Sequence, residues 1–69
     1  MRVREFLQLW RGNFEILDAK DNILCMHVME PIYNELKYEI VQAAWFAYEK
    51  ESNDHIMVIK VNVWRKSIE

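Results

Sequence analysis

The first hydrophobic residues of the chain follow the spacing of a helix. Four of them fall at i, i+3, i+4 and i+7, which places them on one side of a helix: Val3, Phe6, Leu7 and Trp10. Gly12 follows, and glycine readily adopts the left-handed backbone conformation that is common just after a helix. The pattern therefore predicts a helix over about 2–11, with its apolar stripe, Trp10 included, in the core and Gly12 at its end.

Two short runs of strand-forming residues come next, at 14–19 and 23–28. The residues between them are Lys20, Asp21 and Asn22, and Asp and Asn side chains often bond their own backbone in turns. These runs predict a β-hairpin. Pro31 then suits the first turn of a helix, because its missing N–H would have no partner there. A short second helix is therefore expected over about 31–36.

The segment 37–49 fits two interpretations. Apolar residues at 32, 36, 40, 43 and 47 have helical spacing, so one continuous helix over 31–50 is the first. Such a helix would be apolar almost all round at 43–48 and would need burial on every side, which a chain this small cannot supply. As a strand, the same residues divide into two faces, with Ala44, Phe46 and Tyr48 on the face expected to meet the helices. The aromatic and branched residues of this segment also favour strands. We favour the strand, and the long helix stays the alternative.

The clearest strand pattern covers 56–64, after a polar turn at 51–54. One face of this strand is wholly apolar and is expected to pack against the helices: Met57, Ile59, Val61 and Val63. The predicted element order is α-β-β-α-β-β. We therefore expect a single α+β domain over 1–69, with a four-stranded, mainly antiparallel sheet and the short helices on one face.

The opposite face of this sheet should lack a cover, since two short helices cover only one side. Strict alternation places six residues there: Val41, Trp45, Val58, Lys60, Asn62 and Trp64. Cys25 and His27 join them if the other residues of their strand point inward, namely Leu24, Met26 and Val28. Monomers rarely expose so large an apolar face, which predicts either a homo-oligomer or a surface for a partner or ligand.

Charge is unevenly distributed, although the net charge is only −2. Basic residues gather at both ends of the chain, and the middle is acidic. The net charge argues against general nucleic-acid binding, but the two basic ends would form an anion-binding patch if they meet in space. In particular, Trp64 could stack on a nucleotide base while Arg65 and Lys66 hold its phosphate.

Cysteine content and hydropathy indicate the compartment. Cys25 is the only cysteine, so no disulfide can form within the chain, whereas small secreted domains usually depend on disulfides. No uncharged apolar run approaches the roughly 20 residues that span a bilayer, and the first ten residues do not follow the pattern of a signal peptide. We expect a cytoplasmic protein with no membrane association.

No residue pattern predicts catalysis, a metal site or a cofactor. His27 and His55 have no Cys, Asp or Glu at the spacing of metal ligands. Cys25 has no adjacent basic residue to activate its thiol. The only glycine, Gly12, cannot form a glycine-rich phosphate loop. We therefore expect a protein that is not an enzyme and acts by binding.

Four stretches of the chain resemble a known class of small proteins. They are VREFL at 3–7, FEILD at 14–18, LKYEIV at 36–41 and IMVIKV at 56–61. They resemble small accessory proteins that are carried by phages and prophages of low-GC Gram-positive bacteria. Several proteins of that class block host defence by binding, so the resemblance implies a binding protein in the host cytoplasm.

Two functions are therefore expected from the sequence. The first is direct binding and inhibition of a host defence protein. The alternative is an oligomer that sequesters a nucleotide signalling molecule between its subunits. The candidate binding residues for a partner or ligand are the same in both cases: Trp45, Lys60, Asn62, Trp64, Arg65 and Lys66.

Overall fold

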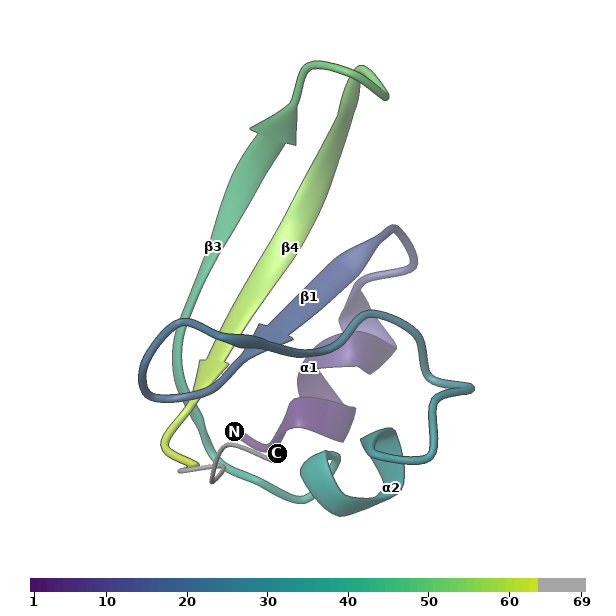
Figure 1. The fold of residues 1–69 in the computed structure, drawn as a ribbon. Helices are drawn as coiled ribbons and strands as arrows, with labels where there is room; N and C mark the ends of the chain where they lie inside the picture. The colour runs from purple at the N-terminus through teal and green to yellow at the C-terminus, as the bar shows by residue number, and fades with distance from the viewer. Residues whose placement is uncertain (64–69) are drawn as a thin grey trace.

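The computed structural model describes residues 1–63. Its elements are, in chain order, α1 (Val3–Leu9), β1 (Phe14–Leu17), β2 (Ile23–Cys25), α2 (Tyr33–Leu36), β3 (Val41–Glu49) and β4 (Asp54–Val61). The predicted α-β-β-α-β-β order is confirmed (Figure 1). Residues 41–49 form a strand, so the alternative of one helix over 31–50 is wrong.

The four strands form one mixed sheet in the order β2-β1-β4-β3. Adjacent strands β1 and β2 are antiparallel, as are β3 and β4, whereas β1 and β4 are parallel. The sheet is thus mainly antiparallel, as predicted. The parallel pair, β1 and β4, lies at the centre of the sheet. Between these two strands the chain forms β2, α2 and β3, which allows β4 to return in the same direction as β1.

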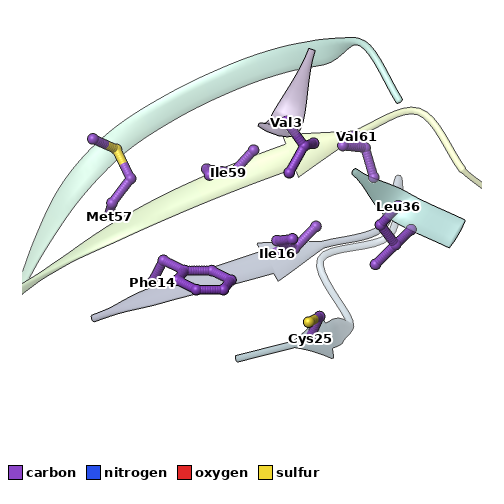
Figure 2. Close-up of a cluster of buried hydrophobic side chains, with 8 residues drawn as sticks. All are labelled: Val3, Phe14, Ile16, Cys25, Leu36, Met57, Ile59 and Val61. Carbon is purple, nitrogen blue, oxygen red and sulfur yellow. The ribbon is translucent and has the colours of Figure 1, made fainter. Parts of the chain in front are cut away.

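One face of the sheet carries the hydrophobic core, shown in Figure 2. Its buried side chains come from both helices and from three strands: Val3, Phe14, Ile16, Cys25, Leu36, Met57, Ile59 and Val61. The predicted inward face of the last strand is confirmed, and Val63 packs partly against the same cluster. Because β4 lies in the middle of the sheet and its inner face is entirely apolar, it forms the centre of this core.

Helix α1 is fastened at its start to the segment that precedes β3. The amides of Val3 and Arg4 donate to the carbonyls of Glu39 and Lys37, each at 2.9 Å. These two amides belong to the first turn, where a helix offers them no internal partner. The Glu5 carboxylate also accepts a hydrogen bond from the Arg2 amide at 2.8 Å. The predicted apolar stripe of this helix packs against the core, with Val3 fully buried.

The expectation for Gly12 is wrong. The helix ends at Leu9, Trp10 is already extended, and no glycine of the described residues has a positive φ. Glycine is needed at position 12 because the Trp10 indole packs directly against its backbone. A Cβ there would lie 2.6 Å from Cζ2 of Trp10. The Trp10 Nε1 donates to the carbonyl of Asn13 at 2.7 Å, which holds the indole over the loop.

The first predicted turn forms around Asp18. Its buried carboxylate accepts hydrogen bonds from the amides of Lys20 and Asn22 at 2.8 and 2.9 Å. The backbone hydrogen bond from Asn22 is the main reason that the pKa of Asp18 is lowered. Asp21 in this turn and Asn53 in the turn before β4 have left-handed backbone conformations, with φ of 68° and 55°. Asp and Asn tolerate that conformation better than most residues.

Two residues lie on the opposite face from the one that strict alternation predicts. The ladder of β3 and β4 shifts between Val41 and Ala43, so Val41 pairs with Val61 and packs against the core. Cys25 pairs with Ile16 and is buried, and β2 ends there, so 26–28 are not part of the strand. Each local irregularity reverses the inward and outward sides beyond it, because side chains alternate with a period of two.

Candidate binding surface

Strand β3 forms one edge of the described sheet, and β4 is its neighbour on the other side. It is the longest strand of the sheet, with nine residues, and its residues from Ala43 to Glu49 all pair with β4. At the start of the strand the Val41 amide donates to the Met1 carbonyl at 2.8 Å. Beyond it, on the side away from β4, the backbone groups of an edge strand can pair with another chain. This edge is therefore a surface on which another strand can be added.

The edge lacks the features by which proteins usually prevent unwanted strand pairing. Such features are charged residues, proline, bulges and very short edge strands. From Ile40 to Tyr48 the sequence contains no charged residue and no proline. The one irregularity lies at the start of the strand, between Val41 and Ala43. From Ala43 to Tyr48 the edge is therefore regular and uncharged, and Glu49 ends the strand.

Large apolar side chains are exposed on both faces of β3. Trp45 lies on the outer face of the sheet and is 44% exposed, whereas Phe46 and Tyr48 lie on the inner face at 56% and 52%. The inner face is open here because β1 pairs with β4 only at 57–60, so the tip of the β3–β4 hairpin projects beyond β1 (Figure 1). Phe46 keeps one edge-to-face contact with Trp10, with ring centroids 5.0 Å apart.

The remaining outer face is less exposed than the sequence predicts. Val58 and Ile56 are buried although they lie opposite the core, so a large apolar patch across this whole face is wrong. Val58 lies on the central strand between Glu15 of β1 and Trp45 of β3, and neighbouring side chains limit its exposure. Exposed apolar surface is thus concentrated on the edge strand β3 rather than on β4.

The predicted binding residues are spread along β3, β4 and the following segment. Trp45 is exposed on β3, opposite Val58. Lys60 lies on the same face but forms an ion pair of 2.8 Å with Asp21 of the first turn. Asn62 is exposed just after the end of β4. The other three predicted residues lie outside the described part of the chain: Trp64, Arg65 and Lys66.

Sequence reasoning missed Phe46 and Tyr48, which it placed on the face covered by the helices. Their alternation with Ala44 is regular, and Ala44 does pack against the core. Only the lengths of the elements could have revealed that Ala44 is covered while Phe46 and Tyr48 are exposed. Two helices of seven and four residues are too short to cover a strand of nine residues.

The environment of Cys25 and the spacing of possible metal ligands bear on the chemistry of the described residues. Cys25 is buried, its Sγ donates to the carbonyl of His27 at 3.1 Å, and burial raises the pKa of its thiol. A thiol in this environment stays protonated at neutral pH, and the thiolate is the nucleophile. Among residues 1–63, no three His, Cys, Asp or Glu side chains gather closely enough to hold a metal ion.

Within the same residues, no helix has the length and apolar character needed to cross a membrane. Comparison of the chain with protein-family models, with curated proteins and with solved structures found no match.

Proposed function

We propose that this chain is a non-enzymatic binding protein that adds its β3 edge to a strand of a partner protein. The observation that supports this proposal is the regular, uncharged stretch 43–48 of the edge strand β3, with aromatic residues exposed on both faces. In strand addition, backbone hydrogen bonds provide affinity and alternate side chains provide specificity. The resemblance to small phage proteins further suggests that the partner is a host defence protein, which binding inhibits in the host cytoplasm.

The aromatic residues of β3 are the expected anchors of this interface. Tryptophan and tyrosine account for a large share of the binding energy at most protein interfaces, especially where a partner buries them completely. Trp45 contacts a partner from the outer face of the sheet, and Phe46 and Tyr48 from the inner face. A strand added at this edge would lie between these two sets of side chains and shield both from water.

Affinity capture from host extract with the wild-type chain and a Trp45→Ala variant tests the proposal. A captured protein is then purified, and its binding is measured for both chains in a titration. We expect Trp45→Ala to weaken binding at least tenfold, whereas a Leu9→Ala control should bind as the wild type does. Leu9 is a suitable control because it is an exposed apolar residue that belongs to α1 rather than to β3. Equal loss in both variants would contradict the proposal.

Self-association is the simplest competing use of the same edge and also stays a prediction. Two copies can pair β3 with β3 antiparallel about a two-fold axis, and the uncharged centre of the strand brings no like charges together. Sedimentation at tens of micromolar distinguishes the two cases. A dimer that Trp45→Ala dissociates would assign the edge to a second copy, whereas a single 8.4 kDa species leaves it free for a partner.

Sequestration of a nucleotide between subunits remains the alternative function. The residues predicted to bind that nucleotide, Trp64, Arg65 and Lys66, lie outside the described part of the chain. A thermal-shift screen with nucleotides tests it directly, since a ligand that binds only the folded state raises the melting temperature.

A further inference from the structure

Three basic side chains from two separate segments meet around Tyr38. The Arg4 guanidinium carbon lies 5.8 Å from the centroid of the Tyr38 ring, and the Lys37 Nζ lies 5.3 Å from it. The Arg2 guanidinium donates a hydrogen bond to the backbone carbonyl of Tyr38. This arrangement follows from the fold, because the start of α1 is hydrogen-bonded to residues 37 and 39.

These charges have little internal compensation. Within residues 1–63, no carboxylate forms an ion pair with Arg4 or Lys37. Among the described residues, the Lys37 Nζ donates a hydrogen bond to the side-chain oxygen of Asn34 alone, at 3.3 Å. Basic groups held close together repel one another, and an anion bound between them removes that repulsion. The cluster thus has the electrostatic character of an anion site.

A shallow hollow lies between these residues. It has a volume of about 400 Å³, and its lining includes Arg4, Gln8, Tyr33, Lys37 and Tyr38 but no carboxylate. A second hollow of about 430 Å³ shares Arg4, Gln8 and Tyr38 with it, and Glu5 is the one carboxylate that lines it. The first volume is within the range of small-ligand sites, about 300–1,000 Å³.

The polar groups of the first hollow suit an oxyanion. A guanidinium can donate two parallel hydrogen bonds to one anion, and an ammonium adds a point charge. The Gln8 amide can donate as well. Burial raises the pKa of Tyr33 above its ordinary value, so its hydroxyl stays protonated and can donate at neutral pH. The α1 amides of Val3 and Arg4 are already bonded to carbonyls, so side chains must hold the ligand.

We propose that Arg4 and Lys37, assisted by Gln8 and Tyr33, bind the phosphate group of a small phosphorylated ligand. Two cations of different shape around one hollow match a phosphate better than a carboxylate, because a phosphate presents three oxygens and up to two charges. The exposed ring of Tyr38 borders the same hollow and offers a flat surface to the remainder of the ligand. This site is separate from β3 and does not depend on the function proposed for that strand.

The test is an NMR titration of the full chain with inorganic phosphate and with a nucleoside 5′-monophosphate, at constant ionic strength. We expect saturable shifts at the amides of Arg4, Gln8, Lys37 and Tyr38. Arg4→Gln and Lys37→Gln should each weaken binding about tenfold or more, as expected for the loss of one charge-assisted contact. Lys50→Gln is the matched control, since it removes one positive charge from the exposed turn after β3.

Tighter binding of the nucleotide than of phosphate would support a ligand that also contacts Tyr38, and equal binding would support a site for phosphate alone. No saturation up to about 10 mM, or equal weakening by Lys50→Gln, would overturn it. If Arg4→Gln lowers the melting temperature, Lys37→Gln still tests the site, because its amide and carbonyl contacts are unchanged. Trp45→Ala should leave phosphate binding intact, which separates failure of this site from failure of the β3 proposal.

Discussion

The two ends of the β3–β4 hairpin have similar alternating sequences but different surroundings. Near the base, Ala44 pairs with Ile59 and both pack on the core under the helices. Toward the tip, Phe46 and Tyr48 continue the same face of β3 and are more than half exposed. The difference shows that alternation decides which residues share a face, whereas the lengths of the covering helices decide whether that face is buried.

Truncation of the buried base should have the largest effect on stability. Ile59 is fully buried in the core, so Ile59→Ala is expected to lower the free energy of unfolding by about 2–5 kcal/mol. Phe46→Ala, on the same face but at the exposed tip, should cost less than about 1.5 kcal/mol even though it removes a larger side chain. Urea denaturation of both variants measures the difference, and equal losses would contradict the distinction between base and tip.

Truncation of Trp45, on the outer face of β3, should instead affect association. Trp45→Ala is expected to weaken self-association or partner binding by at least about 1–2 kcal/mol and to leave the melting temperature of the monomer nearly unchanged. A melting curve and a binding isotherm on the same variant provide the measurement. A large fall in melting temperature with unchanged binding per folded molecule would show that Trp45 is an ordinary packing residue.

Trp10 connects the two regions, because it packs on the core and also contacts Phe46. Gly12→Ala would place a methyl group 2.6 Å from its ring, so the indole has to move. We expect a loss of about 1 kcal/mol in stability, as is typical of overpacking, and a change in tryptophan fluorescence. Arg11→Ala, one residue earlier and exposed, should change neither quantity. An unchanged spectrum for Gly12→Ala would refute this packing.

The smallest expected effect concerns pH. The folded-state pKa of Asp18 is below its ordinary value of 3.8, mainly because the Asn22 amide bonds the carboxylate. The carboxylate therefore stabilises the fold above about pH 4, and this contribution is lost as the pH falls through the lowered pKa. Asp18→Asn should make the stability less dependent on pH in that acidic range. Chemical denaturation at pH 7 and at pH 3 measures it, and an identical pH dependence in both chains would contradict the assignment.

Local sequence signals predicted much of the fold. The apolar stripe of α1, the polar turns and the inward face of β4 are all confirmed, because each depends on spacing within one element. The faces predicted for Val41 and Cys25 were wrong, because each depends on how two strands pair. The register shift after Val41 and the pairing of Cys25 with Ile16 each turned a residue inward. No pattern within one strand reports such a shift, since it is a property of two strands together.

The candidate surfaces were less accessible to prediction. Trp45 could be named from alternation alone, but the exposure of Phe46 and Tyr48 depends on how far β4 extends beyond β1. The basic cluster was foreseen only as a meeting of the two chain ends. In the structure, Arg2 and Arg4 gather with Lys37 at Tyr38, and the basic residues of the other end, Arg65 and Lys66, lie outside the described residues. Arg4 of α1 and Lys37 are far apart in the chain, so their approach is a long-range contact that no local pattern encodes.

By itself, the sequence determined the order of the elements and the apolar faces of α1 and β4, because helical and strand periodicities are local properties of the chain. The tertiary structure decided the parallel pairing of β1 with β4, the exposed edge of β3 and the gathering of Arg4 and Lys37 at Tyr38. Each of these joins residues far apart in the chain. Such contacts form only where the packing of several elements outweighs the entropy lost on closing the intervening loops.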